Sequence, residues 1–382
     1  MTRRVCRFLL CLLLAATVFL PTVFADDADF SETPPDEYSE FLETIPEEIA
    51  ELLPKGLFSD KTADIAEGVR EMSGFSSLLH TLLSIMGASL GDCFATLGRV
   101  VGLLLLSAIF GAFRSSFRSE SVGRAFSFAS SLAILAALLT QTYDAVHAVT
   151  IYFERLNRLT GAVIPLSGAL WAIGGNVTAA TASSASLSIY LTVLEEAVGN
   201  SVVPFCGVCM AFTVVGTIDP NIRLGSLLAS LKKHYTTFLA FLMTILLAML
   251  GFQTTLAARA DSLAMRGVKF AAGNLIPVVG GSVSELLRTV SAGVSYLRGT
   301  VGICALLLTV LSLFPMIARL WLSGLTWQLA AALADLLGCS NEKKLLDETA
   351  SLCGYLLAAA CICSSVLFLA IVLLVRCGAA VG

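Results

Sequence analysis

Long runs without a charged residue are the feature that most constrains how this chain can fold. An α-helix needs about 20 apolar residues to cross the hydrocarbon core of a bilayer. The runs that approach or exceed this length are Ala125–Tyr143, Val198–Ile218, His234–Ala257, Gly299–Ala318 and Thr349–Val375. A sixth run, Cys93–Phe113, is interrupted by Arg99. The sequence therefore predicts an all-α fold, a polytopic integral membrane helical bundle.

Composition agrees with this class, since the chain is 57% hydrophobic and only 14% charged, whereas soluble domains carry about 25% charged residues.

Arg99 has two interpretations, a side chain that snorkels to the interface or a functional charge inside the membrane. The spacings Gly87-x3-Gly91 and Gly98-x3-Gly102 around it predict close approach of helix backbones.

The first 25 residues have the pattern of a secretory signal peptide. Three arginines precede the apolar run Phe8–Leu20, and Val23-Phe24-Ala25 has the small-residue pattern of a cleavage site. We expect cleavage between Ala25 and Asp26, which would leave the mature N-terminus outside the cytoplasm. The alternative is an uncleaved membrane anchor.

An acidic segment follows the signal peptide. Residues 26–71 contain fifteen Asp and Glu residues against three Lys and Arg residues. Glu43–Leu53 and Lys61–Leu83 read as short helices, so we expect an extracytoplasmic segment over 26–92 and a membrane domain over 93–382. The chain has no basic cluster with interleaved aromatic residues, which argues against nucleic acid as a partner.

Part of the membrane domain is repeated at an offset of 112 positions. Ala133–Gly168 aligns without gaps with Ile245–Gly280, and Gln141-Thr142 falls on Gln253-Thr254. Duplicated helical units are common in membrane transporters. The pattern predicts a parallel internal duplication with units of about 125–218 and 237–330, followed by a final span over 349–375.

Each repeat unit contains the motif G-x-x-I-P-x-x-G. Its defining residues are Gly161, Pro165 and Gly168 in the first copy and Gly273, Pro277 and Gly280 in the second. Proline removes a backbone donor and disfavours helix at the residue before it. We therefore expect two re-entrant or interfacial breaks, with a plain kink between two helices as the alternative. These breaks are also the candidate functional sites.

The placement of Lys and Arg predicts the orientation in the membrane. Basic clusters precede the spans that begin at Ala125, His234 and Thr349. Placing all three clusters in the cytoplasm leaves the acidic segment outside and makes the repeats parallel. The segment Arg259–Arg298 argues against this arrangement, because it would then be external although it carries five basic residues.

No residue pattern indicates catalysis, a metal site or a cofactor. The histidines His80, His147 and His234 are scattered. Cys206-x-x-Cys209 lies inside a span without a second pair, so small buried cysteines are the better interpretation. Glu195-Glu196 is either a solvated helix end or a cation or proton site. We therefore expect a protein that is not an enzyme and has no bound cofactor.

Several segments resemble one known family, the stage III sporulation protein AE family. The clearest block runs from Gln253-Thr-Thr-Leu-Ala-Ala-Arg-Ala-Asp-Ser262 into Lys269-Phe-Ala-Ala-Gly-Asn-Leu-Ile-Pro-Val-Val-Gly-Gly281. Thr217-Ile-Asp-Pro220 and the run Leu227–Lys233 are similar too. The resemblance covers roughly residues 40–380 and is specific in the Gln253–Gly281 block.

The resemblance implies a multi-pass protein of the mother-cell membrane that surrounds the forespore in endospore-forming bacteria. It implies a component of a channel or secretion-like complex, with other stage III sporulation proteins as partners and no catalytic residues. A homo-oligomer is compatible with such a role. The alternative is a secondary transporter or permease built from duplicated helical units, which would need a charged or paired substrate site at mid-membrane.

Overall fold

The computed structural model describes residues 33–114, 120–173, 177–218, 224–245, 248 and 280–379. Throughout these ranges the chain forms helices and turns and contains no strand, which confirms the predicted all-α class. The expected signal cleavage site, Ala25 and Asp26, lies outside the described residues.

Short helices come first along the chain, and long helices follow. The short ones are α2 (Asp36–Glu43), α3 (Glu47–Ala50), the 3-10 turn η2 (Lys55–Phe58) and α4 (Thr62–Ser73). The long ones are α5 (Phe75–Arg114), α6 (Glu120–Ile173), α7 (Val177–Ile218), the helical segment 225–245, α9 (Gly280–Leu336) and α10 (Ser340–Ala379). The boundary predicted at residues 92 and 93 therefore falls inside α5, and the predicted helix Lys61–Leu83 is divided at Gly74.

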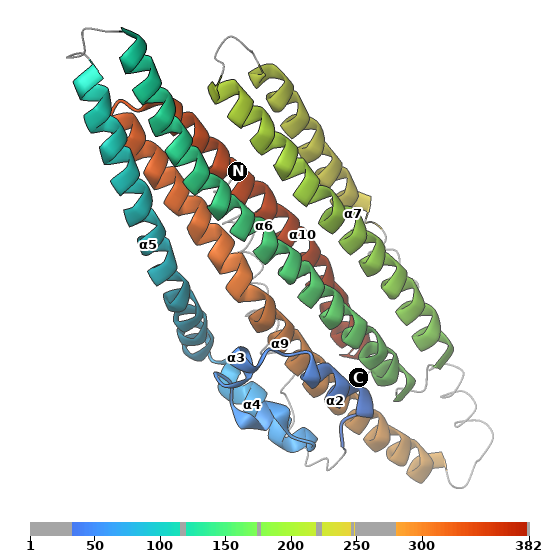
Figure 1. The fold of residues 1–382 in the computed structure, drawn as a ribbon. Helices are drawn as coiled ribbons and strands as arrows, with labels where there is room; N and C mark the ends of the chain where they lie inside the picture. Colours follow the sequence, from blue (N-terminus) through green and yellow to red (C-terminus); the bar gives the residue numbers. More distant parts are fainter. Residues whose placement is uncertain are drawn as a thin grey trace.

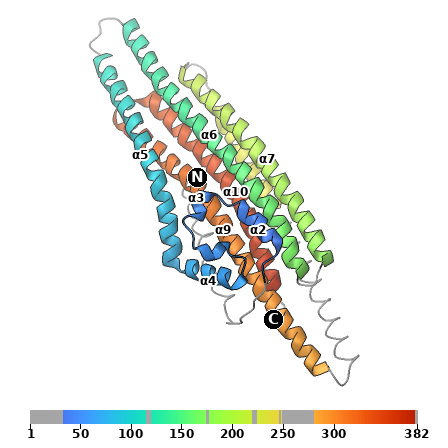
Figure 2. The same ribbon diagram turned by 60° about the horizontal axis from the view of Figure 1, so that its bottom comes forward.

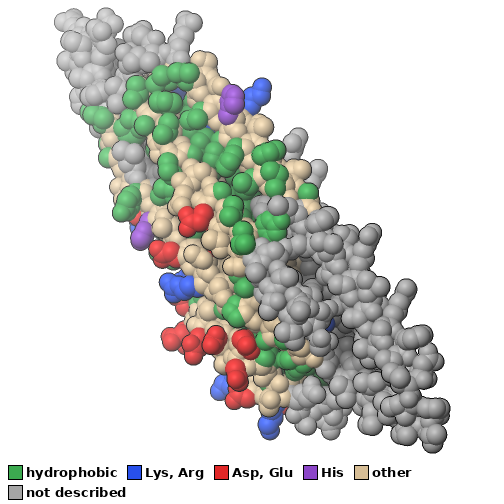
Figure 3. Space-filling view, turned by 90° about the vertical axis from the view of Figure 1, so that its right-hand side faces the viewer, with side chains coloured by type: hydrophobic (Ala, Val, Ile, Leu, Met, Phe, Trp, Pro, Cys, Tyr) green, Lys and Arg blue, Asp and Glu red, His purple; other side chains and the backbone are tan. Residues whose placement is uncertain are grey.

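The long helices run alternately up and down one elongated bundle (Figures 1 and 2). One end of this bundle holds the last residues of α5, α7 and α9 and the first residues of α6 and α10. We call it the basic end, because Lys343 and Lys344 lie there in the first turns of α10. The short helices of residues 33–73 lie at the opposite half, which we call the acidic end. Figure 3 shows apolar side chains over the body of the bundle and acidic side chains gathered toward one end.

A hairpin of α9 and α10 forms the centre of the bundle. Its turn is closed by Gly338, which has a φ of 75°, a conformation that glycine adopts without steric cost. The Cys339 N–H donates to the Ala334 carbonyl at 2.9 Å and the Gly338 N–H to the Asp335 carbonyl at 3.1 Å. This pair of bonds is a Schellman cap, which satisfies the last carbonyls of α9 and reverses the chain.

Within the described residues, four helices are long and apolar enough to cross a membrane. They are Ser76–Ile109, Ser188–Gly216, Tyr296–Leu336 and Ser340–Val372. They contain all or most of the predicted spans at Cys93–Phe113, Val198–Ile218, Gly299–Ala318 and Thr349–Val375. The predicted span Ala125–Tyr143 lies in α6, which is not among these four helices. Of the predicted span His234–Ala257, the structure describes residues 234–245 and 248.

Burial separates the inner helices from the outer ones. In the most apolar part of α10, 89% of the residues are buried, and the corresponding value for α9 is 78%. The value is only 17% for α5. The 54 residues of α6 span about 81 Å at 1.5 Å per residue. This length exceeds a bilayer of about 40–45 Å, and α6 is not among the four candidate membrane helices.

The short helices have a small core of their own and dock on the bundle. α2 contacts α6, and α4 contacts α9. Tyr38 donates its hydroxyl to the Leu57 carbonyl at 2.6 Å and lies 3.0 Å from the Cys304 Sγ of α9. Burial raises the pKa of the Tyr38 hydroxyl well above its ordinary value, so this group remains a proton donor at physiological pH.

Two glycines allow the docked segment to pack tightly. A Cβ at Gly56 would lie 2.8 Å from the Asp64 carbonyl oxygen, and a Cβ at Gly68 would lie 2.9 Å from the Leu57 nitrogen. Both distances are shorter than a real contact of a Cβ atom. The turn η2 and the helix α4 therefore approach each other as closely as their backbones allow.

Candidate functional site in the helical bundle

The first G-x-x-I-P-x-x-G motif lies in the interior of α6. Gly161, Pro165 and Gly168 belong to one continuous helix that ends at Ile173. The expected re-entrant or interfacial break is therefore not what the structure has at this position. Packing explains the difference, because Leu159, Val163, Leu166 and Leu170 are each at most 2% exposed and hold both sides of the proline in helical register.

Two hydrogen bonds also stabilise the helix around the proline, one within α6 and one from α9. Ser167 donates its hydroxyl to the Ile164 carbonyl at 2.7 Å. One turn later, Arg298 of α9 donates from Nε to the Leu170 carbonyl at 2.9 Å. Gly161 is exposed, and a Cβ built on it would meet nothing within 4 Å, so this glycine is not a site of close approach within the chain.

The second motif cannot be compared with the first. Gly273 and Pro277 lie outside the described residues, and Gly280 is the first residue of α9. Most of the second repeat copy lies in the same undescribed range. The duplication at an offset of 112 therefore stays a prediction.

The glycines of α5 are also unpacked within the chain. Gly87, Gly91, Gly98 and Gly102 are exposed, and a Cβ at any of them would meet nothing within 4 Å. The expected close helix approach is thus absent among the described residues of one copy of the chain. The reason is the outer position of α5, whose glycine face points away from α6 and α9.

Glu195 is a buried carboxylate in the interior of α7. Its side chain is 8% exposed, and its Oε1 accepts a hydrogen bond of 2.6 Å from Thr160 Oγ1 of α6. Its Oε2 has no partner among the described residues. Glu196 beside it is exposed. The interpretation of this pair as a solvated helix end is wrong for Glu195, because α7 continues to Ile218.

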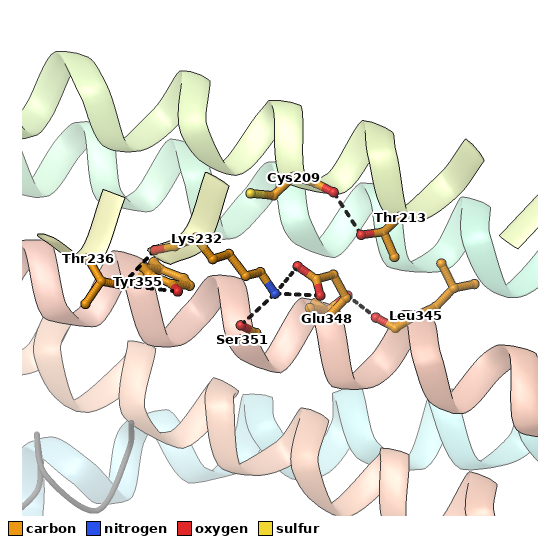
Figure 4. Close-up of polar contacts among 9 residues, drawn as sticks. Cys209, Thr213, Lys232, Thr236, Leu345, Glu348, Ser351 and Tyr355 are labelled. Atoms are coloured by element: carbon orange, nitrogen blue, oxygen red, sulfur yellow. Dashed lines mark hydrogen bonds and ion pairs between the residues drawn. The ribbon is translucent and has the colours of Figure 1, made fainter. Parts of the chain in front are cut away.

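A buried ion pair connects the helical segment 225–245 to α10 (Figure 4). Lys232 Nζ lies 2.6 Å from Glu348 Oε1 and 2.7 Å from Oε2, and it donates to Ser351 Oγ at 3.1 Å. The two charged side chains are only 18% and 12% exposed. Thr236, one turn after Lys232, donates to the Tyr355 hydroxyl at 3.4 Å.

An aromatic cluster lies beside this ion pair. The rings of Phe205 and Tyr235 stack with centroids 3.9 Å apart, and Tyr355 meets Phe205 edge-on at 5.0 Å. The Tyr235 hydroxyl shares a hydrogen bond of 3.2 Å with Ser201 of α7. α7, the segment 225–245 and α10 are thus held together by polar and aromatic contacts at one level of the bundle.

A second polar contact fixes α6 to α10. Tyr152 is 2% exposed and donates its hydroxyl to the Ala360 carbonyl at 3.0 Å, and the same hydroxyl contacts Ser364. At the basic end, Ser107 of α5 donates to Glu342 Oε1 of α10 at 2.9 Å. The polar groups of α10 therefore serve to position the surrounding helices.

A pocket of about 270 Å³ lies between α5, α6 and α9. Four charged side chains line it, two acidic and two basic: Asp92, Arg99, Asp144 and Arg319. All four are exposed, and no ion pair joins them to one another anywhere in the described part of the chain. Arg99 therefore lies close to three other charged side chains, and both of its interpretations stay predictions.

Several of these residues were not identified as candidate site residues from the sequence. Glu348, Ser351 and Tyr355 follow the spacing of one helix face, which was a usable signal for a polar stripe on α10. Asp92, Asp144 and Arg319 are isolated in sequence, so no local pattern links them. Among the described residues, no group of three or more His, Cys, Asp or Glu side chains could hold a metal ion. Cys206 and Cys209 are buried, as expected.

Comparisons with known proteins point in one direction. A sequence model of the family described as stage III sporulation protein AE matches residues 58–378. The chain is 26% identical over 357 residues to a stage III sporulation protein AE of Bacillus subtilis strain 168, and the alignment covers 90% of this chain and 86% of that protein. No solved structure matches the chain.

Proposed function

Because the chain belongs to the stage III sporulation protein AE family, we propose that it is a non-enzymatic membrane component of a multiprotein channel or secretion-like complex between mother cell and forespore. The observation that carries this proposal is the family match over residues 58–378, which runs from η2 almost to the end of α10. The apolar bundle with its long, partly buried helices suits such a component.

The orientation we propose places the mature N-terminus outside the cytoplasm of the mother cell, in the membrane around the forespore. Its support is the common location of the helix ends at the basic end, opposite the acidic segment. Arg114, Lys343 and Lys344 belong to helix termini at that end. The positive-inside rule then assigns the basic end to the cytoplasm.

We also propose that the G-x-x-I-P-x-x-G motifs are surfaces for contact with other components of the complex, including further copies of this chain. Gly161 and Pro165 are exposed on α6, and the space beside Gly161 is open. An exposed glycine in an apolar helix permits the backbone of a partner helix to approach closely. The duplicated motif would offer such a surface twice.

The test of the proposal is isolation of the complex from sporulating cells. A tagged chain replaces the native copy in the bacterium that encodes it, membranes are solubilised in mild detergent, and co-purifying proteins are identified by mass spectrometry. We expect other stage III sporulation proteins in stoichiometric amounts and loss of heat-resistant spores on deletion. Normal spore yield without the chain would contradict the proposal.

The pocket between α5, α6 and α9 supports the second candidate, a secondary transporter or permease, because charged residues at mid-span are what a substrate site requires. The two functions differ in what the isolated chain does. A transporter would move solute in proteoliposomes that contain this chain alone, whereas a component of a complex would need its partners.

A further inference from the structure

Four charged side chains line the pocket between α5, α6 and α9. Asp92 lies about 26 Å from the start of α5, and Arg99 lies about 23 Å from its end. Arg319 lies within the candidate span Tyr296–Leu336. Asp92 and Arg99 likewise lie within the candidate span Ser76–Ile109, whereas Asp144 lies in α6, which is not one of the four candidate spans.

Their exposure requires water in the pocket. A charged side chain at the centre of a bilayer is costly unless water or a charged partner reaches it. Asp92, Arg99, Asp144 and Arg319 are all exposed rather than enclosed by protein. Ser89, Thr96 and Ser323 add polar groups to the same walls. Water that reaches the pocket removes this cost, and the volume of about 270 Å³ has room for several water molecules.

The two signs of charge indicate the kind of solute. Two carboxylates and two guanidinium groups line the pocket without pairing with one another in the described part of the chain. We infer that this pocket is a water-filled binding site for small zwitterionic solutes, with an ammonium group held by the aspartates and a carboxylate held by the arginines. Arginine binds a carboxylate through two parallel hydrogen bonds. The inference rests on the proposed function and deepens it, because it names the class of solute that a conduit would admit.

A native cysteine reports on the pocket. Cys93 lines it and is half-buried, whereas the other cysteines whose burial the structure describes are buried. A thiol reacts through its thiolate, which forms in water and not in lipid. Cys93 should therefore react with hydrophilic reagents that cannot enter the hydrocarbon core.

The experiment measures this reaction in membrane vesicles from cells that produce the full chain without other sporulation proteins. Cys377 is first replaced by Ser, and the Cys93→Ser variant is the blank. Two methanethiosulfonates are compared, one with a trimethylammonium group and one with a sulfonate group. We expect both to modify Cys93, and we expect a pool of neutral free α-amino acids to slow both reactions, whereas sodium chloride at the same concentration does not.

Charge variants test the role of the walls. The double variant Arg99→Gln/Arg319→Gln should slow the sulfonate reagent relative to the ammonium reagent by about tenfold, and Asp92→Asn/Asp144→Asn should shift the ratio in the opposite direction. Arg155→Gln/Arg158→Gln is the matched control, because these arginines are exposed on α6 and do not line the pocket. That variant should leave the ratio unchanged.

Three results would overturn the inference. Reaction of Cys93 with apolar N-ethylmaleimide but with neither hydrophilic reagent would place the pocket against lipid. Equal rates with and without the amino acids would remove the zwitterion site. An unchanged reagent ratio in both pocket variants would show that the charges do not face the water. If a double variant fails to accumulate, Arg99→Gln alone replaces it. The reagent selectivity of Cys93 and the effect of the amino acids are measured on the chain with all four charges intact, so they do not depend on these variants.

The labelling is independent of assembly with partners. Failure of the chain to co-purify with sporulation proteins would contradict the proposed function and leave the reactivity of Cys93 unaffected. An unreactive Cys93 would contradict the pocket and leave the complex unaffected.

Discussion

Lys232 Nζ lies 2.6 Å from Glu348 Oε1, so one ion pair joins the helical segment 225–245 to the central helix α10. The pair is formed where both side chains are less than one-fifth exposed. Removal of one partner leaves the other charge in an apolar bundle, which costs far more than the net stabilisation of the intact pair.

The ion pair predicts a double-mutant result. Lys232→Met or Glu348→Leu alone should lower the free energy of unfolding by about 3 kcal/mol, whereas the double variant should recover most of this loss. Thermal unfolding in detergent measures the effect. Lys233→Met is the control, because Lys233 is exposed. Equal losses in the single and double variants would contradict a direct interaction.

The buried carboxylate of Glu195 predicts a different result. Glu195→Gln keeps an oxygen that accepts from Thr160 Oγ1 and removes a charge whose second oxygen has no partner among the described residues. We expect unchanged or higher thermal stability and normal spore yield, as for the exposed control Glu196→Gln. A loss of spores at normal protein level would instead indicate a cation or proton site.

Tight packing between η2 and α4 predicts that Gly56→Ala and Gly68→Ala loosen the fold of the segment 33–73. The added Cβ atoms would lie 2.8 Å and 2.9 Å from backbone atoms, and such overpacking costs about 1–3 kcal/mol. Faster cleavage of this segment by an added protease measures the loss of its packing. Gly74→Ala is the control, since a Cβ at this position would lie 4.0 Å from its nearest neighbours. The segment of this variant should be cleaved at the wild-type rate.

The open space beside Gly161 predicts a defect in assembly rather than in folding. A Cβ at Gly161 would meet no atom of the described residues within 4 Å, so we expect Gly161→Val to keep normal protein level and thermal stability. Spore yield should fall, because the larger side chain blocks a partner helix. Gly207→Val is the matched control, being equally open on α7. Normal sporulation of Gly161→Val would remove the proposed contact surface from α6.

Processing of the N-terminus gives a prediction that is independent of the bundle. N-terminal sequencing of the mature, membrane-bound chain should begin at or near Asp26, because Val23-Phe24-Ala25 has the pattern of a cleavage site. External protease should then reach the acidic segment in intact protoplasts. A chain that begins at Met1 would support the uncleaved anchor.

The outcome for the predicted helix break illustrates the limit of local patterns. Pro165 disfavours helix at Ile164 when only neighbouring residues are considered. In the bundle, Leu159, Val163, Leu166 and Leu170 are buried around it, and the free energy of that burial outweighs the lost backbone hydrogen bond. The alternative of a plain kink between two helices depends on the same balance between burial and the lost hydrogen bond. The sequence around Pro165 does not show which of the two is larger.

The sequence by itself determined the all-α membrane class, most of the spans and the family, because each depends on the spacing of residue types along one helix. Charge-free runs are long enough to identify crossing helices without any knowledge of their neighbours. Only the tertiary structure decided that α9 and α10 are central, that Lys232 meets Glu348, and that Asp92, Arg99, Asp144 and Arg319 share one pocket. These residues come from different helices, and their meeting is set by how apolar faces pack together, which local periodicity does not encode.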